Sequence, residues 1–136
     1  MATQTLTGEQ LAAITREMVR IKSKHFGRGA TEGKSYQCDD FLFCVLKGGM
    51  TVAERDLLEH GDAGLVRQVR LRFQENNQSN FEGAVERISG RRVLAYQSQV
   101  LFDPDYTIEI FVPSGVARPP GNSATRLVAN DSSRIR

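Results

Sequence analysis

The sequence predicts an α+β fold in which two β-hairpins form a four-stranded antiparallel sheet with helices packed on it. Residues 36–46 and 93–112 each have the pattern of two strands joined by a turn, the first at Asp39-Asp40 and the second at Asp103-Pro104-Asp105. The segments before and between these hairpins carry apolar residues at helical spacing. The expected order of elements is α-β-β-α-α-β-β.

Length and composition are those of one ordinary globular domain. The chain has 136 residues, of which 40% are hydrophobic and 25% charged. Its net charge of +2 is small for a protein that binds nucleic acid, so such a partner is not expected. The sequence contains no apolar run of about 18 residues and no signal-peptide pattern at its start. We therefore expect a cytoplasmic protein without direct membrane insertion.

The first helix is expected from Thr7 to His25. Thr7 with Gln10 forms a capping box at its start, and Gly27 or Gly29 is free to take the left-handed conformation after its end. Its apolar stripe consists of Leu11, Ile14, Met18 and Ile21. The helix dipole explains the basic residues toward its end, which are Arg16, Arg20, Lys22 and Lys24.

The second strand of the first hairpin is apolar on both of its faces. One face carries Phe41, Phe43 and Val45, and the other carries Leu42, Cys44 and Leu46. This pattern predicts a central strand covered on both sides, so that Val45→Asp would bury a carboxylate without a partner. Cys38 and Cys44 are expected to be buried free thiols, because the turn sets them too far apart for a disulfide.

The middle of the chain is expected to be helical. Thr51 with Glu54 forms a second capping box, for a helix that ends near Glu59. The stretch from Asp62 to about Ile88 has the pattern of one long helix, with the polar run 76–80 as the place where it would bend or break. Gly90 ends this stretch, and the closing strands are Val93 to Phe102 and Thr107 to Val112.

The domain is expected to span residues 1–112, with a flexible basic tail over residues 113–136. The tail holds three of the four prolines and many Gly, Ser and Asn residues. Such a segment buries too little apolar surface to order itself.

The chain contains several short motifs in a specific order and at a specific spacing. They are Phe26-Gly27-Arg28-Gly29, the hairpin Tyr36 to Leu46, Lys47-Gly48-Gly49-Met50-Thr51 with Ala53-Glu54, Gly64-Leu65-Val66 with Val69-Arg70 and Phe73, and Gly90 with Val93 and Ile108 to Phe111. In these motifs the chain resembles the MpsC-like family. These are small bacterial domains related to the C component of the sodium-translocating, membrane-potential-generating Mps system, formerly a domain of unknown function. Ala30 departs from the family pattern, which has proline there.

The resemblance implies a non-catalytic accessory or regulatory domain of cation and inorganic-carbon (bicarbonate or CO2) uptake systems, with a membrane transporter component or another protein as partner. It implies no catalytic residues, and no cofactor or enzyme activity is expected. Cys38, Cys44, His25 and His60 match no zinc-ligand spacing, so no metal site is expected.

Arginines are the candidate binding residues for an anion or a partner carboxylate. They are Arg28, Arg67, Arg70, Arg91 and Arg92. The competing interpretation is structural, with Arg28 beside a helix stop and the others on a solvated face. If the arginines converge, the alternative function is a regulatory domain that binds a small anion or a nucleotide.

A homodimer is the expected assembly. A four-stranded sheet keeps two edges, and exposed edges invite pairing. The strand Val93 to Phe102 has no lysine or proline to prevent such pairing. The alternative is a monomer in which this strand is central.

Overall fold

The computed structural model describes residues 5–115 as four helices and four strands. In chain order they are α1 (Gly8–Phe26), β1 (Glu32–Cys38), β2 (Phe41–Lys47), α2 (Val52–Glu59), α3 (Ala63–Asn76), α4 (Gln78–Ser89), β3 (Val93–Leu101) and β4 (Tyr106–Pro113). The predicted α+β class and both hairpins are confirmed. The stretch from Asp62 to Ile88 holds two helices, so three helices separate the hairpins.

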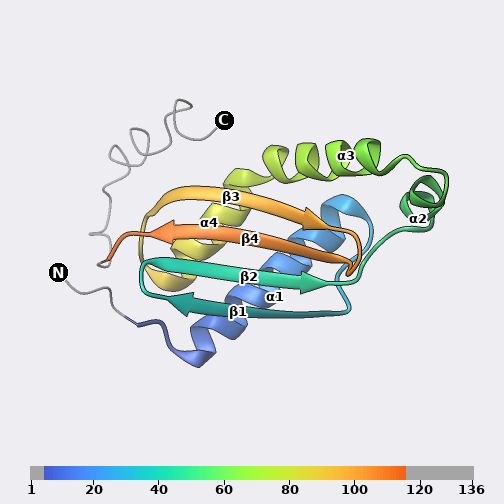
Figure 1. Ribbon diagram of the computed structural model, residues 1–136. Helices are drawn as coiled ribbons and strands as arrows, with labels where there is room; N and C mark the ends of the chain where they lie inside the picture. The colour runs from blue at the N-terminus through green and yellow to red at the C-terminus, as the bar shows by residue number, and fades with distance from the viewer. Residues whose placement is uncertain (1–4, 116–136) are drawn as a thin grey trace.

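The four strands form one antiparallel sheet in the order β1-β2-β4-β3. Helices α1 and α4 lie together on one face of this sheet, while α3 lies beside β3 and α2 beyond the end of the strands (Figure 1). No described helix covers the opposite face, which looks toward the viewer in Figure 1. The fold therefore has two layers.

Both predicted capping boxes are present. The Thr7 hydroxyl accepts from the backbone N–H of Gln10 at 3.0 Å, and the Gln10 side-chain oxygen accepts from the backbone N–H of Thr7 at 2.9 Å. Thr51 and Glu54 make the same exchange at the start of α2. Gly27 ends α1 with a φ of 95°, a left-handed conformation that glycine adopts without strain.

The polar run 76–80 separates α3 from α4. The Asn77 side chain donates to the Phe73 carbonyl at 3.0 Å and accepts from the Asn80 side chain at 3.0 Å. The backbone bonds from Asn77 N–H to the Phe73 carbonyl and from Phe81 N–H to the Asn77 carbonyl are still present, so the side-chain bonds accompany the break between the helices and do not replace the helical bonds. Asp62 stands at the predicted start of α3, but its side chain makes no capping hydrogen bond.

The core lies between the sheet and the helix pair α1 and α4. Its most completely buried members include Ile14, Met18, Leu42, Leu46, Phe81, Val85 and Phe111, each no more than 1% exposed. Strand β2 is central, as predicted, with β1 and β4 on its two sides.

The prediction that both faces of β2 are covered is wrong. Leu42, Cys44 and Leu46 face the helices and are buried, whereas Phe43 and Val45 are half-buried and Phe41 is 46% exposed. Apolar residues on both faces indicate that both faces prefer to be covered, but they do not say that the same chain covers both.

The hairpin register is the predicted one, with Cys38 opposite Phe41 and Cys44 opposite Ser35. Cys44 is buried, and burial raises the pKa of its thiol to about 11. The prediction for Cys38 is wrong, because this thiol is exposed beside the turn. The turn needs a left-handed residue, and Asp39 supplies it with a φ of 51°.

The folded part of the chain includes Pro113, the buried last residue of β4, and Ser114, whose N–H donates to the Arg92 carbonyl at 2.7 Å. The rest of the expected tail, from residue 116, lies outside the described residues. Within residues 5–115, no helix has the length and apolar character needed to cross a membrane.

Candidate functional site

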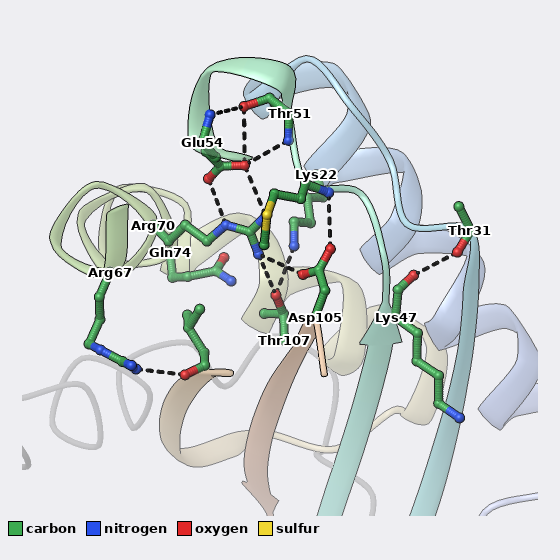
Figure 2. Close-up of polar contacts among 12 residues, drawn as sticks. Lys22, Thr31, Lys47, Thr51, Glu54, Arg67, Arg70, Gln74, Asp105 and Thr107 are labelled. Carbon is green, nitrogen blue, oxygen red and sulfur yellow. Dashed lines mark hydrogen bonds and ion pairs between the residues drawn. The ribbon is translucent and has the colours of Figure 1, made fainter. Parts of the chain in front are cut away.

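A network of charged side chains lies buried where α1, α2, α3 and the start of β4 meet (Figure 2). Lys22 and Arg70 are each only 2% exposed. The Lys22 ammonium donates to the Thr107 hydroxyl at 2.9 Å, and Arg70 Nη1 donates to the same oxygen at 3.3 Å. Arg70 Nη1 also lies 3.6 Å from a carboxylate oxygen of Asp105. Thr107 thus joins two buried cations.

Glu54 holds Arg70 in place through a two-pronged ion pair. Arg70 Nε donates to Glu54 Oε2 at 2.7 Å, and Nη2 donates to Oε1 at 3.0 Å. Glu54 Oε1 also accepts from the Thr51 N–H at 2.9 Å, so the glutamate of the α2 capping box is the partner of Arg70. Burial opposes ionisation of Glu54, but the bonds from Arg70 and Thr51 outweigh it and lower its pKa.

The loop between β2 and α2 carries Glu54 to this position. Gly48 and Gly49 have φ values of 78° and 91°, and a Cβ on Gly48 would lie 2.5 Å from the Thr31 hydroxyl oxygen. Asp105 fixes the loop from the other side, because its carbonyl accepts from Gly48 N–H at 2.8 Å and its carboxylate from Met50 N–H at 3.2 Å. The two glycines are therefore required for the loop to pass here.

Glu109 is the second buried carboxylate, with no exposed surface, at the centre of β4. One of its oxygens accepts from the Tyr96 hydroxyl at 2.5 Å and the other from the Gln74 side-chain amide at 2.7 Å. Burial raises its pKa to about 7, although its hydrogen bonds and nearby Lys22 favour the charged form. Glu109 therefore changes charge near neutral pH.

Lys22 is shifted in the opposite sense. Burial, followed by the nearby charge of Arg70, lowers its pKa to about 8, against the attraction of Glu109, Asp105 and Glu54. The network connects three helices to β4, and two of its groups, Glu109 and Lys22, have pKa values near neutral pH. Its two cations, Lys22 and Arg70, are closed to solvent. The arrangement therefore suits a role in packing the helices on β4 better than contact with a substrate.

The structure separates the predicted arginines. Arg70 is buried in the network, whereas Arg67 points toward β3, where its Nη1 donates to the Val100 carbonyl at 2.7 Å and its guanidinium stacks over Phe102 at 4.8 Å. Arg28 is exposed in the loop after α1. Arg67 and Arg70 are three residues apart in sequence, but they do not present their charges together.

Arg91 and Arg92 follow α4 at the start of β3. Arg91 is 3% exposed, and burial lowers its pKa. Its Nε and Nη1, together with Nε of Arg92, find no hydrogen-bond partner among the described residues. Arg91 is thus the more buried of two predicted arginines that keep donors without a partner among the described residues.

Sequence patterns missed Lys22, Glu54 and Glu109 as members of one cluster. Two signals were present. Lys22 lies four residues after Met18, on the apolar stripe of α1, and Glu109 lies between the inward-facing Thr107 and Phe111 of β4. A charged residue at an inward-facing position indicates a buried partner.

Apolar side chains gather on the face of the sheet that no described helix covers. Its residues are Tyr36 from β1, Phe41, Phe43 and Val45 from β2, Tyr106, Ile108, Ile110 and Val112 from β4, and Leu101 from β3. Tyr36, Phe41 and Leu101 are 43–46% exposed. We call this surface the open sheet face. Its apolar residues continue across neighbouring strands, as in the row Tyr36, Phe43 and Ile110.

A comparison with protein families shows the family of this chain. Residues 7–114 match the family described as the Na+-translocating membrane potential-generating system (MpsC). The chain belongs to the MpsC family. In this MpsC-family chain the matched residues include every helix and strand described above. Neither the curated proteins nor the solved structures contain a match to it.

Proposed function

We propose that this MpsC-family chain is a non-catalytic accessory component of a cation and inorganic-carbon uptake system, and that it acts in the cytoplasm through self-assembly and protein binding. Family membership supports the link to a sodium-translocating system. The open sheet face is the observation that supports action by assembly, because large contiguous apolar patches mark interaction sites.

The occupant we propose for the open sheet face is a second copy of the chain. The face has the anatomy of an interface, with an apolar centre on β2 and β4 and a polar rim on the edge strands. The rim includes Gln97 and Gln99 on β3 and Glu32 and Lys34 on β1. Because β1 carries both a negative and a positive side chain, unlike charges can face each other where two copies meet.

The size of the face is sufficient for a two-fold dimer. Four strands about 4.8 Å apart and about 23 Å long give a projected area of roughly 440 Å². With the relief of the side chains, two such faces bury on the order of 1,000 Å² in total, the lower limit for a specific interface. Sheets packed face to face lie about 10 Å apart, which these side chains fill.

Affinity capture from detergent-solubilised host membranes tests the function. Tagged wild-type protein should recover an integral membrane subunit of a cation or bicarbonate transporter. Ile110→Glu, which places a charge at the centre of the open sheet face, should lose the untagged second copy of the chain that the wild type also recovers, while staying folded. Ala12→Glu is the matched control, because it adds the same charge on the exposed surface of α1. Recovery of the chain alone by the wild type contradicts the proposal.

Arg91 supports a second candidate function, a regulatory domain that binds a small anion. Its two unpaired guanidinium nitrogens would be satisfied by a carboxylate, phosphate or bicarbonate oxygen. An anion at about 100 times its dissociation constant would stabilise the fold by about 2.7 kcal/mol. A melting shift with bicarbonate or phosphate that Arg91→Gln abolishes would establish this function, and the absence of any shift would exclude it.

A further inference from the structure

A groove of about 380 Å³ lies between β3 and the helices α3 and α4. Its volume is at the small end of the range of ligand-binding pockets. Leu71, Gln74, Glu75 and Gln78 line it on the helical side, and residues 96–99 line it on the strand. Among these described lining residues Glu75 alone is charged, and its carboxylate also lies 3.5 Å from Arg72 Nε. A groove whose described lining offers a carboxylate and no lysine or arginine suits a cation better than an anion.

The two glutamines of the groove use their amide nitrogens to hold buried carboxylates. Gln74 Nε2 donates to Glu109 Oε2 at 2.7 Å, and Gln78 Nε2 donates to Glu82 Oε2 at 2.9 Å. Neither glutamate has any exposed surface. A charged carboxylate accepts hydrogen bonds and donates none, so these bonds fix which end of each amide is the nitrogen. The oxygen is therefore the atom that each glutamine offers to a further partner.

Gln74 Oε1 is a buried acceptor that lacks a donor. Gln74 is 2% exposed, and this oxygen has no hydrogen-bond partner among the described residues. A buried acceptor without a donor destabilises the fold, and a ligand that donates to it recovers the loss. Leu71, which is 37% exposed, adds an apolar wall to the same groove.

We infer that this groove binds a compact organic cation, a primary ammonium or a guanidinium on a short apolar chain. The N–H groups of such a cation donate to the oxygens of Gln74 and Gln78, as acceptors on the helical side require. Its charge is attracted by the Glu75 carboxylate, and its chain packs against Leu71. The inference rests neither on the dimer proposed for the open sheet face nor on anion binding at Arg91.

Glu109 lies behind this site and couples it to pH. While Glu109 is charged, it holds the amide nitrogen of Gln74 and leaves Oε1 as the free end. Protonated Glu109 can donate to Gln74 Oε1 once the amide has turned over, and the groove then meets an amide nitrogen, which cannot accept from a cation.

The charged and titratable groups around Glu109 act in the same direction. They are Lys22 from α1, Cys44 from β2, Arg70 from α3, Glu82 from α4 and Tyr96 from β3. Lys22, with a pKa of about 8, becomes charged as the pH falls through this value. Its positive charge disfavours a second cation nearby, so acid weakens the site through both Glu109 and Lys22.

Titration of the full chain with n-butylammonium and n-butylguanidinium, followed by NMR, tests the inference. At pH 8 both probes should shift the side-chain amide signals of Gln74 and Gln78 in a saturable way. Tetramethylammonium, a cation without N–H donors, and butyrate, an anion with a similar chain, are the matched controls and should leave these signals unchanged. The absence of a saturable shift with both probes, or an equal response to tetramethylammonium, overturns the inference.

Glu109→Gln tests the role of Gln74 Oε1 without changing the lining of the groove. The amide introduced there can donate to Gln74 Oε1 and so withdraw this acceptor from the ligand. The variant should bind n-butylammonium at least about tenfold more weakly than the wild type at pH 8. Glu59→Gln makes the same chemical change at an exposed position of α2 and should bind like the wild type. Equal binding by Glu109→Gln and the wild type overturns the inference.

The wild type supplies a second measurement, which decides if Glu109→Gln does not fold. Lowering the pH from 8 to 6 should weaken binding by about tenfold, because the charged fraction of Glu109 falls by about this factor around its pKa of about 7. Both probes stay charged over this range. Equal affinity at pH 6 and pH 8 overturns the inference.

Discussion

Substitution of Glu109 by glutamine should change how the stability of the protein depends on pH. Glu109 has no exposed surface, and burial raises its pKa from 4.5 to about 7. The folded chain therefore holds this proton more tightly than the unfolded chain. The stabilisation is complete below pH 4.5 and is lost as the pH rises through 7.

The expected magnitude follows from these two pKa values. Between pH 5 and pH 8, ionisation of Glu109 lowers the free energy of unfolding by about 2.5 kcal/mol. Glutamine stays neutral over this range. It can accept from the Tyr96 hydroxyl, and its amide can donate to Gln74 Oε1, which has no partner among the described residues. The free energy of unfolding of Glu109→Gln should therefore increase relative to that of the wild type by about this amount as the pH rises.

Urea unfolding at pH 5, 6, 7 and 8 measures the effect. The difference between Glu109→Gln and the wild type should grow steadily with pH. Glu59→Gln, which removes an exposed carboxylate of α2, is the matched control. Its free energy of unfolding should differ from that of the wild type by the same amount at all four pH values. Parallel curves for Glu109→Gln and the wild type would refute the reasoning, because they would show that Glu109 has the same pKa in the folded and unfolded chain.

Lys22 should produce the opposite trend at higher pH. Its pKa falls from 10.5 to about 8 on folding, so its charge destabilises the fold below pH 8 and the penalty is relieved as the pH rises from 8 to 10.5. The combined contribution of these two groups to the free energy of unfolding is therefore smallest between about pH 7 and 8.

Three further predictions concern single side chains. Arg70→Met should lower the free energy of unfolding in urea by about 3–5 kcal/mol, because it leaves a buried carboxylate unpaired; a loss below about 1 kcal/mol would show that the pair is solvated. Leu46→Asp should prevent folding, whereas Val45→Asp on the open sheet face should give a folded chain with a circular dichroism spectrum like the wild type; equal losses would mean that both faces are covered within one chain. Cys38 should react at once with a thiol reagent and Cys44 only after denaturation, so that two fast thiols would contradict the assignment of faces.

Sequence patterns predicted the elements well because each rests on local chemistry. The capping boxes at Thr7 and Thr51 and the two-residue turn at Asp39-Asp40 are decided by neighbouring residues, and all three are present. The break at Asn77 was foreseen as a site of bending for the same reason. Local patterns also set the register of the first hairpin.

The candidate site was harder to predict because it depends on which elements meet in space. Arg70 looks like a neighbour of Arg67 on one helix, yet its partner Glu54 comes from a different helix. Lys22 looks like a dipole partner at a helix end, but it is buried against Thr107 from the far end of the chain. No periodicity in the sequence encodes these encounters. The two apolar faces of β2 were visible in the sequence, but what covers the second face was not.

The mass of the protein in solution tests the proposal of self-assembly through the open sheet face most directly. Light scattering on wild-type protein at micromolar concentrations should give twice the chain mass of 15.1 kDa, and so should Ala12→Glu. Ile110→Glu should give a folded chain at the monomer mass. A wild-type mass of 15.1 kDa at every concentration, or a dimer that Ile110→Glu leaves intact, would contradict the account.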